Sequence, residues 1–97
     1  MRLVLHPKVY SVIDKIMAYY EQVATMDLAN EFYAELRRFI KTSVAQPDSF
    51  AIRTRDIRRV NLDRFPYHFL FSVVGDEVRL LVVRHHSRHP SLGIRRR

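Results

Sequence analysis

The spacing of apolar residues changes once along this chain of 97 residues, and that change limits the possible folds more than any other feature. Up to Val44, apolar residues recur at steps of three and four, as on one face of a helix. From Asp56 onward they alternate with polar residues or form short runs, as in strands. The length suits one core, so we expect a single domain, residues 1–97, with helices preceding a sheet.

The first half predicts a helical hairpin over residues 7–46. Pro7 suits the first position of a helix, Asp27 is the expected N-cap of the second helix, and Pro47 ends it. Each helix carries one apolar stripe, formed by Val9, Val12, Ile13, Ile16, Met17, Tyr20 and Val23 in the first and by Leu28, Phe32, Leu36, Phe39, Ile40 and Val44 in the second. A short connection makes the helices antiparallel, so both stripes face a common side.

The second half predicts an antiparallel meander of three strands. The first strand contains Val60 and Leu62, and the other two span residues 67–74 and 77–84. Gly75-Asp76 between them is a two-residue connection of the kind that closes tight hairpins.

Two segments flank these elements. Residues 2–5 are a short strand candidate, placed at a sheet edge or beside the last strand, and residues 47–55 have no clear period and are expected to form a surface loop. The fold class is therefore α+β, with an N-terminal strand, an antiparallel helical hairpin and a three-stranded antiparallel meander, in the order β-α-α-β-β-β. The hairpin is expected to cover one face of the sheet.

Positive charge is concentrated in the second half. The net charge is +7, residues 1–50 are neutral in sum, and residues 51–97 contain eleven arginines and no lysine. Arginine pairs with carboxylates and phosphates in a planar, bidentate geometry. We therefore expect an anionic partner on this half; the alternative is a solvated basic face.

Several classes of protein are excluded or disfavoured. Without cysteine, the chain has no disulfide, no thiolate chemistry and no cysteine-based zinc site. A metal site at His85, His86 and His89 is disfavoured because adjacent strand residues point apart, and we expect no metal or cofactor. No apolar run could span a membrane and no signal peptide is evident, so we expect a soluble, cytoplasmic protein with no membrane partner.

Three motifs in the second half resemble the ParE branch of the RelE/ParE toxin superfamily. They read Arg58-Arg59-Val60-x-Leu62-x-Arg64-Phe65-Pro66-Tyr67, Gly75-Asp76-x-Val78-x-Leu80-Leu81-Val82-Val83 and His85-x-x-Arg88-x-Pro90. The resemblance covers nearly the whole chain and implies the strand and helix order derived above. It also implies the toxin of a bacterial type II toxin–antitoxin, or plasmid stabilisation, system. Such a toxin is silenced in a hetero-oligomeric complex by a cognate antitoxin, which we expect to have an acidic C-terminal segment.

The resemblance leaves two modes of action open. ParE-like members poison DNA gyrase without chemistry of their own, whereas RelE-like members cleave messenger RNA on the ribosome. Cleavage requires a base, an acid and cations around the phosphate, and the candidates for these roles are His86, Arg58, Arg59 and Arg88. His68 occupies a position where RelE-like nucleases carry arginine, and histidine is mostly neutral at cytoplasmic pH. We therefore favour gyrase poisoning, with a degenerate, non-toxic member as a third possibility.

Under the gyrase hypothesis no catalytic residue is expected, and certain side chains are candidates for binding the target or the antitoxin. These are Arg59, Arg64, Tyr67, Arg84, His86 and Arg88. Tyr67 has an alternative role in the core. Arg64 has an alternative role in fixing, through backbone carbonyls, the Asp63-Arg64-Phe65-Pro66 corner between the first two strands of the meander. His85 and His86 point to opposite faces of a strand, and His86, if it is the exposed one, is the better candidate.

Overall fold

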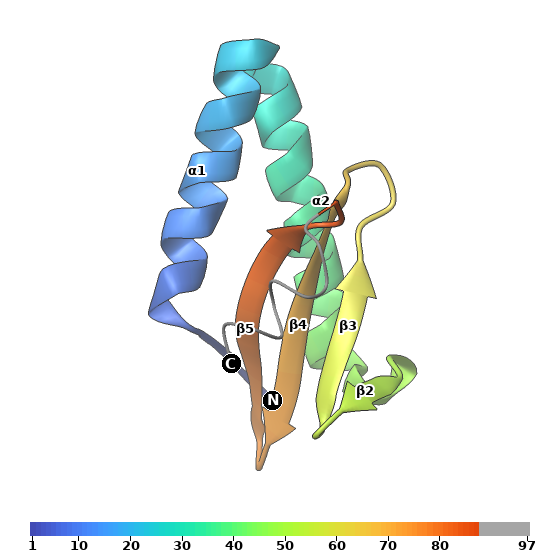
Figure 1. Cartoon of the computed structure of the whole chain (residues 1–97). Coiled ribbons are helices and arrows are strands. Elements are labelled where there is room, and N and C mark those ends of the chain that lie inside the picture. The colour runs from blue at the N-terminus through green and yellow to red at the C-terminus, as the bar shows by residue number, and fades with distance from the viewer. Residues whose placement is uncertain (88–97) are drawn as a thin grey trace.

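The computed structural model describes residues 1–87 and has the predicted α+β architecture with one additional strand (Figure 1). The elements are β1 (Arg2–Leu5), α1 (Pro7–Val23), α2 (Met26–Ala45), a short 3₁₀ helix η1 (Pro47–Ser49), β2 (Ile52–Thr54), β3 (Ile57–Asn61), β4 (Tyr67–Val74) and β5 (Glu77–His85). Arg88, a candidate binding and catalytic residue, lies outside the described residues, as do His89 and Pro90.

The helical hairpin has the predicted extent, but its second helix begins earlier than expected. Pro7 is the first residue of α1, and the Nδ1 of His6 accepts a hydrogen bond from the backbone N–H of Lys8. The N-cap of α2 is Thr25, whose Oγ1 accepts from the backbone N–H of Leu28 at 3.0 Å. The prediction of Asp27 as N-cap was wrong; that residue lies in the first turn, where its charge favours the helix dipole.

The sheet has the strand order β1-β5-β4-β3-β2 and is mixed. The meander of β3, β4 and β5 is antiparallel, as predicted, and β1 occupies an edge, also as predicted. β1 runs parallel to β5, with Arg2 opposite Glu77 and Leu5 opposite Leu80. A parallel pair needs a long connection, and the helical hairpin with the meander supplies it.

The segment expected to be a loop, residues 47–55, instead contains η1 and β2. β2 pairs with β3 through a two-residue turn, Arg55-Asp56, in which both residues have positive φ angles of 47° and 64°. Such φ values suit a type I′ hairpin, which normally carries Asn-Gly. The prediction failed because the turn lacks that signature and the strand is only three residues long.

The core lies between one face of the sheet and the helical hairpin, and Figure 1 shows both helices on that face. Phe32 and Leu36 of α2 and Phe69, Phe71 and Leu80 of the sheet are almost completely buried. In contrast, Val23 is exposed, although its spacing placed it on the apolar stripe of α1. The opposite face of the sheet is not covered by either helix and is called the open face below.

A bulge between β4 and β5 keeps Phe69 and Phe71 of β4 and Leu80 and Val83 of β5 on the core face. Phe69 lies opposite Val83, but Phe71 lies opposite Leu80, so Leu81 is one extra residue on β5. The bulge resets the alternation of β5. As a result, the end of β5 presents Arg84 on the open face, opposite His68.

Candidate functional site

Polar side chains gather on the open face where β4 begins and β5 ends. Asn61 of β3 lies opposite His68 of β4, which in turn lies opposite Arg84 of β5. His86 follows β5, and its backbone N–H donates to the carbonyl of Pro66 at 2.8 Å. The group formed by Arg59, Asn61, His68, Arg84 and His86 is called the open-face cluster.

Hydrogen bonds connect the members of this cluster. The Nε of Arg84 donates to the Nε2 of His68 at 2.8 Å, and the Nδ1 atoms of His68 and His86 lie 3.0 Å apart. The two rings are nearly parallel, at 7°, with centroids 5.1 Å apart, so the nitrogens point at one another edge to edge. The Nε of Arg59 donates to the Oδ1 of Asn61 at 2.8 Å.

The direction of this hydrogen-bond chain follows from its first donor. A guanidinium N–H can only donate, so the Nε2 of His68 must accept and a neutral His68 carries its proton on Nδ1. That proton is donated to the Nδ1 of His86, which therefore carries its own proton on Nε2. The cluster thus offers an N–H donor at the exposed edge of His86.

Both rings are held in the neutral form. Burial of His68, followed by the charges of Arg59 and Arg84 and by His86, lowers its pKa from 6.5 to about 4. Desolvation, then the charges of Arg59 and His85, lowers the pKa of His86 from its usual value. Both effects penalise an additional positive charge, so the neutral forms predominate at neutral pH.

Three of the six predicted binding residues, Arg59, Arg84 and His86, come together in the open-face cluster. Tyr67 does not join them: it is 9 % exposed and lies in the core, where its ring contacts those of Tyr20 and Phe32. His85 lies on the core side of β5 with its ring against Tyr67, at a centroid distance of 5.0 Å. His86 is the exposed member of the His85-His86 pair.

Arg58 lies on the other face of β3 from Arg59 and is separated from the cluster. Its Nη1 contacts the carboxylate of Asp48 at 3.1 Å and the carbonyl of Pro47. Arg58 therefore attaches η1 to the sheet. The structure does not bring together the full set of residues proposed for RNA cleavage, since Arg58 faces away from His86.

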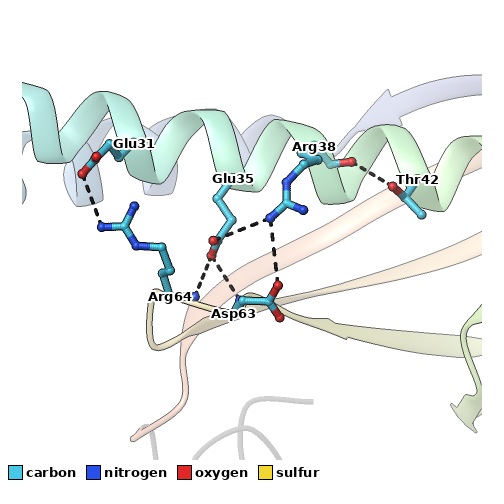
Figure 2. Close-up of polar contacts among 6 residues, drawn as sticks. All are labelled: Glu31, Glu35, Arg38, Thr42, Asp63 and Arg64. Carbon is cyan, nitrogen blue, oxygen red and sulfur yellow. Dashed lines mark hydrogen bonds and ion pairs between the residues drawn. The ribbon is translucent and has the colours of Figure 1, made fainter.

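Arg64 lies at the corner between β3 and β4, which α2 holds in place (Figure 2). One carboxylate oxygen of Glu35 accepts the backbone N–H groups of Asp63 and Arg64, each at 3.1 Å. The Arg64 guanidinium reaches Glu31 at 3.5 Å and lies over the ring of Phe65. Arg64 thus fixes the corner through carboxylates of α2 rather than through backbone carbonyls.

Sequence reasoning did not identify Glu35, Asn61 or the full role of His68. Glu35 is only 7 % exposed, and a signal existed: a charged residue at the spacing of the apolar stripe of α2. Asn61 and His68 are polar residues in strands that are otherwise rich in apolar residues, but the strand register is needed to bring them together.

The described part of the chain places few potential metal ligands together. No group of three or more histidine, aspartate or glutamate side chains within residues 1–87 could hold a metal ion. Within the same residues, no helix is both long enough and apolar enough to cross a membrane.

Solved structures share this fold, although neither a protein-family model nor a curated protein sequence matches the chain. The chromosomal ParDE toxin–antitoxin system of P. aeruginosa contains a chain with a TM-score of 0.78 and 22% identity, covering 88% of this chain and 95% of its own length. The isolated E. coli RelE toxin matches with a TM-score of 0.61 and 13% identity, and the match covers 98% of this chain and 96% of the RelE chain. A chain of the intact E. coli RelBE toxin–antitoxin complex matches with a TM-score of 0.61 and 12% identity, and the match covers 90% of this chain and 98% of that chain.

These similarities extend over nearly the entire length of each chain. They confirm, for the fold, the resemblance that the sequence motifs indicated. The TM-score is higher for the ParDE structure than for either RelE structure. The chain has the α+β fold of the RelE/ParE toxin superfamily.

Proposed function

We propose that this chain is the ParE-like toxin of a type II toxin–antitoxin system, which inhibits growth by poisoning DNA gyrase and is neutralised by a cognate antitoxin. The fold supports the general assignment, because the similar structures are toxins or toxin–antitoxin complexes by their own descriptions. The choice of gyrase over RNA as the target rests on one observation, the hydrogen-bond chain from Arg84 through His68 to His86. This chain leaves His86 without a free basic nitrogen.

A general base must present an unprotonated nitrogen to the hydroxyl that it activates. The exposed Nε2 of His86 carries a proton, and its Nδ1 accepts from His68. If the Nδ1 of His86 donated to the Nδ1 of His68 instead, a neutral His68 would carry its proton on Nε2, directly facing the Nε–H of Arg84. The contact with Arg84 therefore opposes the tautomer of His86 that could act as a base.

The acid role is disfavoured as well. Protonating a leaving oxygen requires imidazolium, and desolvation together with Arg59 lowers the pKa of His86. Arg58, a proposed cation for the phosphate, faces away from His86. The described cluster is therefore better suited to binding than to RNA chemistry, which favours a gyrase-directed toxin over a ribosome-dependent endoribonuclease.

The antitoxin belongs to the same proposal. Eleven arginines in residues 51–97 supply positive charge that would attract an acidic segment. Arg59 makes no ion pair with any described residue, whereas Arg58, Arg64 and Arg79 each contact a carboxylate. An acidic antitoxin segment would complement this charge in the hetero-oligomeric complex, and the cytoplasm is where gyrase would be met.

The decisive experiment follows DNA and protein synthesis by pulse-labelling in bacteria minutes after this protein alone is induced. The proposal predicts early loss of DNA synthesis, and accumulation of cleaved plasmid when purified gyrase is mixed with the protein. Co-expression of the cognate antitoxin should prevent both effects. Early loss of protein synthesis that His86→Ala abolishes would contradict the proposal and support the endoribonuclease, while loss of neither would support the non-toxic module.

A further inference from the structure

We infer that the open-face cluster is a carboxylate-binding site for an acidic and partly apolar polypeptide segment, in which His86 serves as a neutral N–H donor and His68 as the residue that positions it. The inference rests on the proposed function only for the identity of the segment, which would then belong to the antitoxin. Its chemistry rests on the cluster itself.

The first element of the site is the fixed donor. The Nδ1 of His86 already accepts a hydrogen bond from His68, so its ring can rotate little without losing that contact. The backbone N–H of His86 is also bound, to the carbonyl of Pro66. The exposed Nε2–H therefore has a defined direction, and a donor held in place in advance binds an anion at a lower entropic cost.

The second element is the charge. Arg59 is half-buried on the open face, close enough to lower the pKa of both histidines, and its Nε is held by Asn61. This contact uses only the Nε of the guanidinium, and its two Nη nitrogens form no ion pair within residues 1–87, which leaves them for an added carboxylate. A guanidinium and an N–H donor on one surface suit a carboxylate or a phosphate oxygen.

The third element, the apolar surface beside the cluster, favours a carboxylate of a peptide over a phosphate of a nucleic acid. Arg59 lies opposite Leu70, which lies opposite Val82, so a row of aliphatic side chains adjoins the cluster on the same face. The rings of Tyr67, Phe69 and Phe71 all point into the core instead. Proteins that bind single-stranded nucleic acids commonly stack the bases on exposed aromatic rings, so charge beside an aliphatic row favours a peptide that alternates acidic and apolar residues.

The tautomers can be tested directly on the ¹⁵N-labelled protein, using long-range ¹H–¹⁵N correlation of the imidazole rings. The Nδ1 atoms of His6 and His85 accept backbone hydrogen bonds, so both should be Nε2–H tautomers, as should His86. His68 should be the one Nδ1–H tautomer among these four rings. Arg84→Lys keeps the charge but removes the Nε–H, and it should release His68 to a mixture of tautomers. An Nδ1–H tautomer at His86 in the original protein would overturn the inference.

The ligand class is tested with two probes of equal length, a peptide that alternates glutamate and leucine and a single-stranded DNA oligonucleotide. The peptide should shift the ring signals of His86 but not those of exposed His6, and its glutamine-for-glutamate counterpart should bind at least about tenfold more weakly, since the charge-assisted contacts are lost.

Two variants separate a local site from general basicity. Arg59→Gln should weaken peptide binding about tenfold. Arg79→Gln removes the same charge from the same face, but Arg79 already contacts Glu77 at 3.0 Å, so binding should hardly change. Equal losses in both variants, or stronger binding of the DNA than of the peptide, would overturn the carboxylate assignment. Because no measurement here involves gyrase, failure of the proposed target would leave these results unaffected.

Discussion

At the scale of single residues, His68 couples the stability of the fold to pH. It is only 4 % exposed, and its pKa falls from 6.5 to about 4. Between these two values the unfolded chain binds more protons than the folded one, so stability rises with pH. The charged or titratable groups that face the ring are Arg59 from β3, Arg84 from β5 and His86 just after β5, and none of them stabilises imidazolium.

The resulting prediction concerns acid unfolding. The contribution of neutral His68 is complete above about pH 6.5 and should be lost as the pH falls towards 4, reducing the free energy of unfolding by up to about 3 kcal/mol. His68→Asn keeps a donor for His86 but does not titrate, so its urea-unfolding free energy should vary less with pH over this range. His6→Asn, which keeps a helix cap, is the control and should follow the original protein. Identical pH profiles for all three proteins would contradict the assignment.

A second residue-scale prediction concerns Glu35. Its buried carboxylate accepts two backbone N–H groups from the β3–β4 corner, and removing it leaves both donors without their partner (Figure 2). Glu35→Ala should therefore lower the free energy of unfolding by about 2–4 kcal/mol, whereas Glu35→Gln, which retains an acceptor oxygen, should cost about half of that. Glu31→Ala removes a half-exposed ion pair and should cost less than about 1 kcal/mol. Denaturant unfolding measures all three, and equal effects of Glu35→Ala and Glu31→Ala would exclude the anchoring role.

At the scale of elements, the β2–β3 hairpin contains backbone strain. Arg55 and Asp56 both have positive φ angles, which residues with a Cβ rarely adopt. Replacing the pair with Asn-Gly should raise the free energy of unfolding by about 1 kcal/mol, because these residues suit the turn. Arg53→Asn removes an arginine from the same hairpin without changing a turn residue, and it should give no gain in thermal or chemical unfolding. A stabilisation of similar size in this control would attribute the effect to the loss of an arginine and not to the turn.

The elements also show how far the sequence could predict the structure. Both helices were predictable because their apolar residues repeat with the period of one buried face, and the meander because its apolar residues alternate or form short runs around the Gly75-Asp76 connection. β2 was not, because Arg55-Asp56 does not signal a turn. Of the candidate site, Arg59, Arg84 and His86 were identified from residue type. That Arg58 faces the opposite side, and that Asn61 and His68 complete the cluster, follows from the strand register and the bulge at Leu81.

At the scale of the whole molecule, the acidic residues that the structure describes compensate positive charge unevenly. Glu77 contacts Arg2 and Arg79 at one end of the sheet, and Asp48 contacts Arg58 at its β2–β3 edge. Arg59, at the open-face cluster, contacts no described carboxylate. An acidic partner drawn by the net charge of +7 should therefore meet an uncompensated guanidinium at the open-face cluster.

The last prediction uses this uneven compensation to test how the proposed antitoxin would bind. If its acidic segment docks at the open-face cluster, the dissociation constant of the complex should rise with sodium chloride concentration, because the contacts are exposed to screening. Arg59→Gln should weaken the complex at low salt and reduce its salt dependence. Arg79→Gln has the same net charge and should retain both the affinity and the slope, since Glu77 already compensates Arg79. Titration calorimetry of the three complexes over a salt series distinguishes the models: equal slopes for the two variants would mean that the basic surface acts through its total charge, without a defined site.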